Sequence, residues 1–387
     1  MRLFYTEKGG NIFLKKFVLI PDSFKGTMSS TEICQTLEEA IRMHHEDAEI
    51  ASIPVADGGE GSVDCFLTAL GGEKVTLTVK NPYMEDMTAY YGLIDEGQTA
   101  VIEMAACAGL PLVEDRKDPL KTTTYGVGEL MLHAAEQGVK KIIVGLGGSS
   151  TNDGGCGAAA AAGVQFYNEK EELFVPTGGT LKDIARIDAS HLVASLTEVE
   201  IVTMCDIDNP MYGPTGAAHV FGPQKGADVD MVLFLDEGVK HLAKVIQRDL
   251  KMDLSTMPGT GAAGAMGAGM VAFFHSTLQM GIETVLDTVN FEEIIQDVDY
   301  IFTGEGKMDF QSLRGKVVIG VAKRAKKQGK KVIVIAGGAD QGIEEAYEVG
   351  VTAVFTINRL PEPLEISRHK SRENLYDTVD NILRILQ

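Results

Sequence analysis

Short apolar runs alternate with amphipathic helical segments at both ends of the chain. The runs 17–20 and 50–55 predict strands, and each leads through a glycine-containing loop into a segment with helical apolar spacing. The first of these helices begins with the capping box Ser29-Ser-Thr-Glu32. Repeated strand–helix units of this kind predict a parallel sheet covered by helices on both faces. Toward the C-terminus the same alternation predicts strands over 299–303, 332–336 and 352–357, with helices over about 316–328, near 344–348 and after 375.

The middle of the chain has a different pattern. The apolar runs 88–94 and 99–104 flank Asp95-Glu-Gly-Gln98, which predicts an antiparallel hairpin. Further strands are predicted over 141–146 and 201–205, separated by an alanine- and glycine-rich helix and a long loop. We therefore expect an α/β protein with two domains and a ligand site in the cleft between them, where pockets concentrate. The expected domains are a discontinuous parallel-sheet domain formed by residues 1–75 and 285–387, and an inserted mixed-sheet α/β domain formed by residues 76–284.

Length and composition agree with a two-domain globular protein. The 387 residues exceed an ordinary single core, and 44% hydrophobic with 23% charged residues is typical of soluble proteins. The 43 glycines exceed the usual share by about a half and occur in clusters, which indicates tight turns or close approach of backbone to a ligand. The net charge of −20 argues against a nucleic-acid surface, so an anionic ligand would need a local set of basic side chains.

The cysteines and the apolar runs indicate the cellular compartment in which the protein works. The five cysteines are scattered and form no C-x-x-C pair, which favours reduced thiols over a disulfide framework or a zinc site. The N-terminal segment lacks the long apolar core of a signal peptide, and no run approaches the roughly 20 apolar residues of a membrane span. These features predict a cytoplasmic protein without membrane contact.

The sequence lacks several familiar catalytic motifs, and two glycine-rich segments match known nucleotide-binding motifs only in part. There is no P-loop, no H-E-x-x-H, no G-x-S-x-G and no protein-kinase motif set. Residues 258–269, PGTGAAGAMGAG, contain a formal G-x-G-x-x-G without a strand before it, so we expect close helix packing or a phosphate-facing helix start there. Residues 144–153, VGLGGSSTND, are similar to the loop of galactokinase–homoserine kinase enzymes, but that family's companion segments are missing.

The polar residues 149–152 (SSTN) join a strand to the alanine-rich helix expected to begin near Gly154. Their hydroxyl and amide groups are suited to cap that helix. The free amides at a helix start also attract a phosphate or a carboxylate, and the two interpretations are compatible. Asp153 is then a candidate for a residue beside a metal or for a base.

Two further loops follow the N-terminal strands. Asp22, Ser23 and Lys25 follow the first strand, and Asp57 and Glu60 lie in the glycine loop after the second. An isolated Asp-Gly-Gly is most often an ordinary turn. Loops at neighbouring strand ends converge, however, so together these two loops are a site candidate.

Residues 204–227 are the most specific segment of the middle region. Asp206 and Asp208 directly follow a predicted strand, where they are suited to hold Mg²⁺ or to accept a hydroxyl proton. Asn-Pro and Gly-Pro pairs in the same segment are turn signals and explain part of the pattern on structural grounds. Gln224 and Lys225 are placed for an anion, whereas His219 has no second histidine at ligand spacing.

Residues 299–316, DYIFTGEGKMDFQSLRGK, are the most informative stretch. After the predicted strand we expect a Gly304-Glu305-Gly306 turn, at the edge of the sheet where α/β proteins hold phosphorylated ligands. A turn with solvated charges is the alternative, and the density of charged groups between glycines makes it less attractive. Glu305 and Asp309 are candidates for Mg²⁺ or water, and Lys307, Arg314 and Lys316 for phosphoryl oxygens or a carboxylate.

Together these segments resemble the bacterial glycerate kinase family. The resemblance implies a flavodoxin-like fold for the discontinuous domain and ATP-dependent phosphorylation of D-glycerate with Mg²⁺, with 2-phosphoglycerate as the favoured product. It runs from about residue 16 to the end, so residues 1–15 are expected to be an extension or an upstream start. Lys307 stands where the family commonly has arginine, which keeps the charge but loses the forked donor. The matching segments are 21–26, 54–62, 101–110, 144–155, 205–227, 258–269 and 303–316.

For this reaction we expect three sets of residues, and a homodimer is one option for the assembly. Asp206 or Asp57 would accept the proton of the C2 hydroxyl, with Lys25 as a third catalytic candidate. Mg²⁺ would be held by Asp206, Asp208 or Glu305. Glycerate would be bound by Ser23, Lys25, Asn152 and Arg314, and the ATP phosphates by Gly147, Gly148, Ser149, Lys225, Gly304, Gly306, Lys307 and Lys316.

Other functions stay open at this stage. One is a kinase for another small hydroxy acid or sugar acid. Another is a non-catalytic metabolite sensor on the same fold, which predicts binding without ATP turnover and loss of the acidic residues, all of which are present. A dehydrogenase would rest only on the glycine motif near Gly259, which lacks its strand.

Overall fold

The structure is a computed structural model and describes residues 14–56, 58–310, 312–314, 316–358, 360 and 362–386. The chain forms two compact units. The first unit comprises the chain up to Ala56, Thr68–Gly71 and the chain from Ile282 onward, and the second unit comprises Asp57–Leu67 and Gly72–Gly281. The expected fold class, an α/β protein with a parallel and a mixed sheet, is confirmed.

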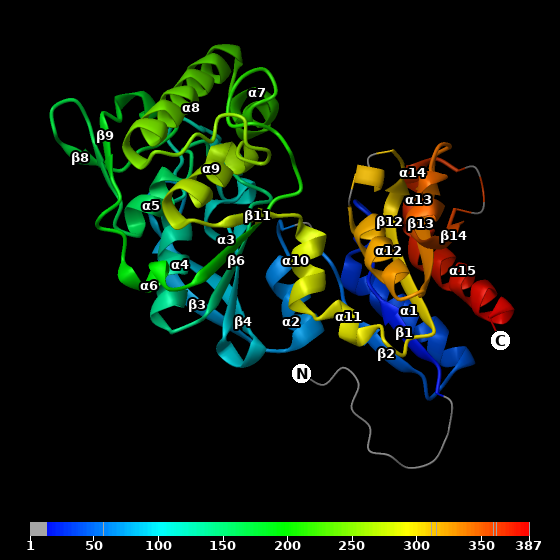
Figure 1. The fold of residues 1–387 in the computed structure, drawn as a ribbon. Helices are drawn as coiled ribbons and strands as arrows, with labels where there is room; N and C mark the ends of the chain where they lie inside the picture. The colour runs from blue at the N-terminus through cyan, green and yellow to red at the C-terminus, as the bar shows by residue number, and fades with distance from the viewer. Residues whose placement is uncertain are drawn as a thin grey trace. The chain divides into compact units, whose positions relative to one another are not determined.

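The sheet of the first unit is entirely parallel, with the order β2-β1-β12-β13-β14. Counted within this unit, the order is that of flavodoxin-like folds, in which ligands bind where the strand order reverses. Here the reversal lies between β1 and β12, so N-terminal (blue) and C-terminal (yellow and orange) strands share one sheet (Figure 1). The strands are β1 (Lys16–Leu19), β2 (Glu49–Ser52), β12 (Tyr300–Met308), β13 (Lys331–Ala339) and β14 (Val351–Thr356).

Helix α1 (Ser30–His44) shows how local sequence fixes an element of this unit. The predicted capping box is confirmed: the Ser29 hydroxyl accepts from the Glu32 amide, and the Glu32 carboxylate accepts from the Ser29 amide. The apolar side chains at helical spacing on α1 belong to the same core as those of α15 (Ser371–Ile385). The other helices of this part of the chain are α10 (Gly281–Thr288), α11 (Phe291–Ile294), α12 (Val317–Lys327), α13 (Glu345–Val349) and α14 (Leu364–Ser367).

The predicted turn at Gly304-Glu305-Gly306 is wrong. Strand β12 continues through it to Met308, because β13 also extends to Ala339 and the two strands pair in parallel over the whole length. The glycines permit this close pairing: a Cβ on Gly304 would lie 2.0 Å from the Ile335 carbonyl oxygen. Glu305 therefore sits on a strand in the sheet and not on a loop.

The second unit is built on a mixed six-stranded sheet with the order β11-β10-β6-β5-β4-β3. The predicted hairpin is confirmed as antiparallel β4–β5, and β3, which was not predicted, adds a second antiparallel pair. Strands β5, β6, β10 and β11 are parallel. The strands are β3 (Glu73–Lys80), β4 (Asp86–Ile94), β5 (Thr99–Glu103), β6 (Lys141–Gly145), β10 (Glu200–Met204) and β11 (Thr277–Gln279).

Helices cover this sheet over one large apolar core. Helix α9 fills the interior with alanine, glycine, methionine and phenylalanine, and it follows a loop, as the glycine motif without a strand predicted. Close packing of this helix, one of the two expectations for the motif, is confirmed: a Cβ on Gly269 would lie 2.3 Å from the Gly154 carbonyl oxygen in the turn before Cys156. The other expectation, a phosphate-facing helix start, stays a prediction. The helices are α2 (Ser62–Leu70), α3 (Ala105–Ala108), α4 (Tyr125–Glu136), α5 (Cys156–Ala161), α6 (Ala194–Thr197), α7 (Ala217–Phe221), α8 (Val229–Leu250) and α9 (Ala262–Phe274).

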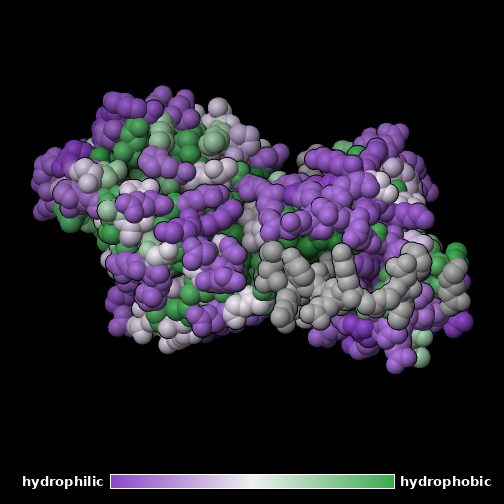
Figure 2. Space-filling model, turned by 60° about the horizontal axis from the view of Figure 1, so that its bottom comes forward, coloured by the Kyte–Doolittle hydropathy of each residue, from purple (hydrophilic) through white to green (hydrophobic). Residues whose placement is uncertain are grey.

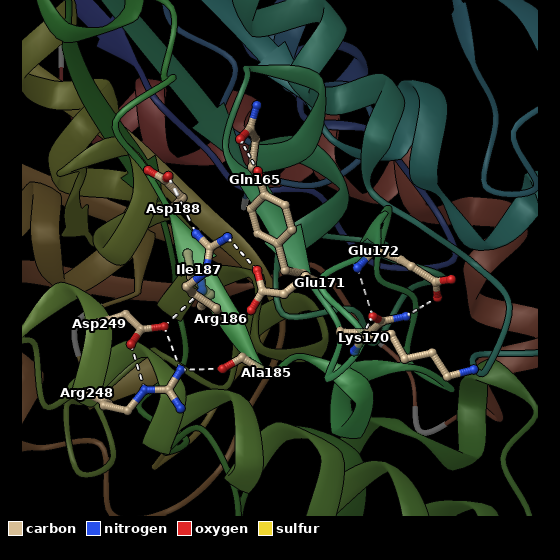
Figure 3. Close-up of polar contacts among 12 residues, drawn as sticks. Gln165, Lys170, Glu171, Glu172, Ala185, Arg186, Ile187, Asp188, Arg248 and Asp249 are labelled. Atoms are coloured by element: carbon tan, nitrogen blue, oxygen red, sulfur yellow. Dashed lines mark hydrogen bonds and ion pairs between the residues drawn. The ribbon is translucent and has the colours of Figure 1, made fainter.

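A small antiparallel sheet occupies part of the region where a long loop was predicted. Its order is β8 (Leu173–Phe174), β7 (Gln165–Tyr167) and β9 (Arg186–Asp188). Asp249 at the end of α8 accepts a hydrogen bond from the Ile187 amide at 2.9 Å, and the Arg186 guanidinium lies 3.8 Å from the centre of the Tyr167 ring (Figure 3). Phe166 and Ile187 of these short strands also belong to the apolar core of the unit, so buried side chains and polar contacts hold the small sheet together.

Hydrophilic residues predominate on the face of the molecule shown in Figure 2, with hydrophobic residues scattered among them. Within the described part of the chain, no helix combines the length and apolar character needed to cross a bilayer.

Candidate active site

The first unit gathers charged groups where its strand order reverses. The loop after β1 lies against the end of β12: the Asp22 amide donates to the Gly304 carbonyl at 2.8 Å. A Cβ on Gly306 would lie 3.3 Å from both the Phe24 Cα and the Lys25 amide nitrogen. The structure thus brings the predicted residues Ser23 and Lys25 to the carboxyl end of the strand that carries Glu305, as the convergence of neighbouring strand ends predicts.

Glu305 is the most perturbed carboxyl group of this cluster. Its residue is only 7% exposed, and burial raises the pKa of its carboxyl to about 7, with smaller contributions from the charges of Asp22 and Asp309. A Ser312 hydrogen bond and the charge of Lys316 oppose that rise in pKa. Its Oε1 atom is buried without a hydrogen-bond partner among the described residues. A ligand or a proton at this oxygen would satisfy it.

The basic residues predicted around this strand differ in their surroundings. Lys307 forms an ion pair with Asp340 at 2.8 Å on the surface, which raises the pKa of its ammonium group. Lys316 is the N-cap residue of α12 and is exposed. The Arg314 side chain and the whole of Asp57 lie outside the described part of the structure. The roles of these four residues stay predictions.

The second unit contains a pocket of about 340 Å³ at the carboxyl ends of β6 and β10. The glycine loop 146–149 and residues 204–207 contribute to its lining. The loop 58–60 is held against the glycine loop by direct backbone packing: the Gly147 amide donates to the Gly58 carbonyl at 3.0 Å, and a Cβ on Gly147 would lie 2.4 Å from the Gly59 Cα. The remaining lining residues are Gly59, Glu60, Phe221, Gln224, Ala262 and Ala263.

Two predicted metal candidates stand at the end of β10. Asp206 lines the pocket, its Oδ1 accepts a hydrogen bond from the Gly281 amide at 2.7 Å, and both Asp206 and Asp208 are exposed. Mg²⁺ is usually held by one or two carboxylates together with substrate phosphates and water. Among the residues that the structure describes, no group of three His, Cys, Asp or Glu side chains forms a complete metal cage. This donor set fits a metal that arrives with a phosphorylated substrate.

Residues 149–152 do not cap α5, contrary to the prediction. The N-cap is Gly155, in a left-handed conformation, and Asp153 takes the role expected of its neighbours. Its two carboxylate oxygens accept hydrogen bonds from the amides of Gly155 and Gly157 and from the amide and hydroxyl of Thr124. Asp153 is fully buried, and that burial raises the pKa of its carboxyl. The carboxylate thus organises the backbone behind the pocket.

Lys225 lies behind the glycine loop. It is only 1% exposed, and its Nζ donates to the Ser149 Oγ at 2.7 Å and to the Thr151 carbonyl at 2.6 Å. Burial lowers the pKa of its ammonium group to about 7, opposed by the charge of Asp153. The structure therefore shows Lys225 supporting the loop, and its contact with phosphate stays a prediction.

Asn152 follows in the same loop and is completely buried. Neither atom of its amide finds a hydrogen-bond partner within the described structure, and the same holds for the Thr151 hydroxyl. Unpaired buried polar groups of this kind call for a specific explanation. Substrate binding by Asn152 stays a prediction.

Some features of this pocket were missed in the sequence. Ala263, Gly264 and Ala265 have positive φ angles of 53°, 67° and 66°, and Ala263 lines the pocket. Alanine avoids this conformation, so composition gave no signal for it. The large apolar lining residues Ile207 and Phe221 were also missed, because single apolar residues near Asn-Pro and Gly-Pro turns have no periodicity.

Comparison with known proteins agrees with this architecture. The sequence profile of the glycerate kinase family matches residues 17–387. The chain belongs to the glycerate kinase family. Members include a glycerate kinase of Bacillus cereus, 44% identical over 371 residues, covering 96% of this chain and 97% of the relative. The glycerate 2-kinase of Escherichia coli is 43% identical over 343 residues, covering 88% and 90% of the two chains.

A solved structure extends this glycerate kinase comparison to the fold. A crystal structure described as a glycerate kinase 2 from Salmonella typhimurium LT2 is similar with a TM-score of 0.85 and 40% sequence identity, covering 96% of this chain and 98% of that chain. The resemblance noted in the sequence motifs is therefore confirmed over nearly the whole chain.

Proposed function

We propose that this protein phosphorylates D-glycerate with ATP and Mg²⁺, with 2-phosphoglycerate as the favoured product, in organic acid catabolism. The observation that carries the proposal is the family match over residues 17–387, with relatives named glycerate kinase that align along almost their full length. The two sites described above supply groups that such a reaction needs.

The second unit is proposed to hold the phosphates of ATP. The amide of Gly147 already donates to the Gly58 carbonyl, so the proposed backbone donors to phosphate in this loop are the amides of Gly148 and Ser149, and Lys225 keeps the loop in place from behind. Asp206, Asp208 or Glu305 would hold Mg²⁺, which neutralises charge on the phosphoryl oxygens when bound. Phosphoryl transfer depends mainly on positioning and charge neutralisation, so a site of this kind supports it.

The first unit is proposed to bind glycerate. Ser23 and Lys25 would bind the carboxylate and hydroxyls, with Arg314 as a second cation. Gly304 and Gly306 leave β12 without side chains at their positions, and these two glycines with Lys307 and Lys316 stay proposed for the ATP phosphates. Asp206 or Asp57 would accept the proton of the C2 hydroxyl while its oxygen bonds to the γ-phosphorus, the bond from that phosphorus to the bridging oxygen breaks, and ADP leaves.

The deciding experiment incubates the purified protein with MgATP and D-glycerate and identifies the product by ³¹P NMR. A 2-phosphoglycerate signal is expected, together with stoichiometric ADP. Formation of 3-phosphoglycerate would keep the kinase and overturn the assignment of the reacting hydroxyl. Intact ATP after prolonged incubation would reject glycerate as the substrate, and a panel of other hydroxy acids would then identify the acceptor.

A further inference from the structure

The pocket of the second unit has more apolar lining than phosphate binding requires. Its glycine loop and Ser149 offer backbone amides and a hydroxyl, but Leu146, Ile207 and Phe221 also line it. These three side chains have no role in the phosphate, metal or glycerate sets proposed above. Leu146 is largely buried in the apolar core and Ile207 packs against that core, whereas the half-buried Phe221 keeps surface that an occupant of the pocket could cover.

Glycerate is a poor occupant for this lining. Nearly every part of glycerate is a carboxylate or a hydroxyl, and a polar group placed against apolar side chains loses hydrogen bonds that water provided. Glycerate is also small for a pocket of about 340 Å³. A volume of that size falls within the range of sites that enclose a nucleoside-sized ligand.

Phe221 is suited to receive a flat heteroaromatic ring. It is half-buried, so part of its ring is accessible from the pocket, and it is the last residue of α7. Two neighbours in α7, Ala217 and Ala218, are buried. The turn that follows is fixed as well, because a Cβ on Gly222 would lie 2.4 Å from the Ala218 carbonyl oxygen. A ring held on a packed helix is a preorganised stacking surface.

We infer that the second unit binds the adenosine part of ATP, with the base on Phe221 beside Leu146 and Ile207 and the phosphates toward the loop Gly147–Ser149. This inference rests on the proposed function only in taking ATP as the donor. It assigns nucleoside recognition to residues of one unit and explains the apolar lining that the phosphate and glycerate sets leave unused.

The test uses adenosine, which carries no phosphate, as the probe. Binding of adenosine and of ADP to the full-length protein is measured by calorimetry without glycerate, and the KM values for ATP and glycerate are measured in the kinase assay. The variants are Phe221→Ala and Phe221→Leu, the second keeping apolar volume in case the first fails to fold. Phe234→Ala is the matched control, because Phe234 is a 40% exposed phenylalanine of α8 in the same unit that does not line the pocket.

Loss of base stacking should weaken adenosine and ADP binding about tenfold or more in Phe221→Ala, and less in Phe221→Leu. The KM for glycerate should stay within about twofold in both variants, and Phe234→Ala should match wild type. Unchanged adenosine affinity in both Phe221 variants would overturn the inference, as would undetectable adenosine binding to wild type. So would a rise in the KM for glycerate with an unchanged KM for ATP.

The outcome for this inference is separable from that for the proposed function. A wild-type protein that binds adenosine through Phe221 but leaves glycerate unphosphorylated supports the nucleoside site and rejects the acceptor. If the protein phosphorylates glycerate while the Phe221 variants bind adenosine as tightly as wild type, the kinase activity is supported and the nucleoside site is rejected.

Discussion

Lys225 is a buried lysine with a pKa near neutrality, so its contribution to the free energy of unfolding should depend on pH. Below about pH 7 the lysine is protonated in both the folded and the unfolded chain, so folding bears the cost of burying the charge. Above that pH the folded protein loses the proton, while the unfolded chain keeps it up to the ordinary lysine pKa of 10.5. The unfolded state then binds more protons, and the free energy of unfolding contributed by Lys225 rises with pH.

Replacing Lys225 with Met removes this contribution. The difference in free energy of unfolding, wild type minus Lys225→Met, should therefore increase by about 1 kcal/mol per pH unit between about pH 7.5 and 9. Urea unfolding followed at the two pH values gives this difference. Lys244→Met, at an exposed lysine of α8, is the control and should show no such trend. A pH-independent difference for Lys225→Met would show that the ammonium group is not desolvated.

Asp153 and Asp208 are acids with opposite expected roles. In the wild type, backbone N–H groups donate to both carboxylate oxygens of Asp153. In Asp153→Asn one of these oxygens is replaced by an amide nitrogen that cannot accept, so the free energy of unfolding should fall by about 3 kcal/mol. Asp208→Asn alters an exposed side chain and should leave stability within about 0.5 kcal/mol while lowering kcat if the residue holds Mg²⁺. Paired urea unfolding and steady-state assays separate the two effects. The reverse pattern would exchange the structural and catalytic assignments.

At the scale of elements, the glycine loop is fixed by the loop that packs against it. A Cβ on Gly147 would come within 2.4 Å of the Gly59 Cα, and backbone on both sides leaves no flexible atom to move. Gly147→Ala should therefore separate the two loops, cost about 1–3 kcal/mol of stability and lower kcat/KM for ATP at least tenfold. Gly338→Ala on β13 is the control, since a Cβ there meets nothing within 4 Å. Wild-type ATP kinetics in Gly147→Ala would show that this packing does not position the phosphate loop.

Most elements were predictable from the sequence because their signals are local. The capping box of α1, the β4–β5 hairpin and the parallel strands of the first unit each depend on residues close in sequence. The end of β12 was not predictable, since it is decided by pairing with β13 and not by its own glycines. The small sheet was missed because strands of two or three residues are too short to show an apolar period. Its partners are also distant in the sequence: Phe273 packs on Phe166, and Asp249 accepts from the Ile187 amide (Figure 3).

The candidate site was predictable in its residues more than in their roles. The predicted acids do lie toward the carboxyl ends of strands, Asp206 after β10 in one sheet and Glu305 within β12 in the other, where the sequence had predicted a loop. Burial decided the rest: Asp153 and Lys225 look alike in sequence to solvent-facing candidates, yet both are enclosed and bound to backbone or hydroxyl groups. Burial of a polar residue depends on segments far away in the chain, which no local pattern reports.

At the scale of the whole molecule, the protein should fold without a metal and need one to work. Each unit has an extensive apolar core, and none of the described cysteines forms a disulfide. Within the described residues no cluster of three metal-ligating side chains supports either core, whereas the acids near the pocket fit a metal bound together with phosphate. EDTA in excess should therefore leave the melting temperature within about 1 °C of the untreated protein and abolish phosphorylation.

Added Mg²⁺ should restore the rate of phosphorylation after chelation. MgADP should also raise the melting temperature more than ADP with EDTA, because the metal contributes to nucleotide binding. A large fall in melting temperature on chelation would instead reveal a structural metal, and full activity in EDTA would remove Mg²⁺ from the phosphoryl-transfer step.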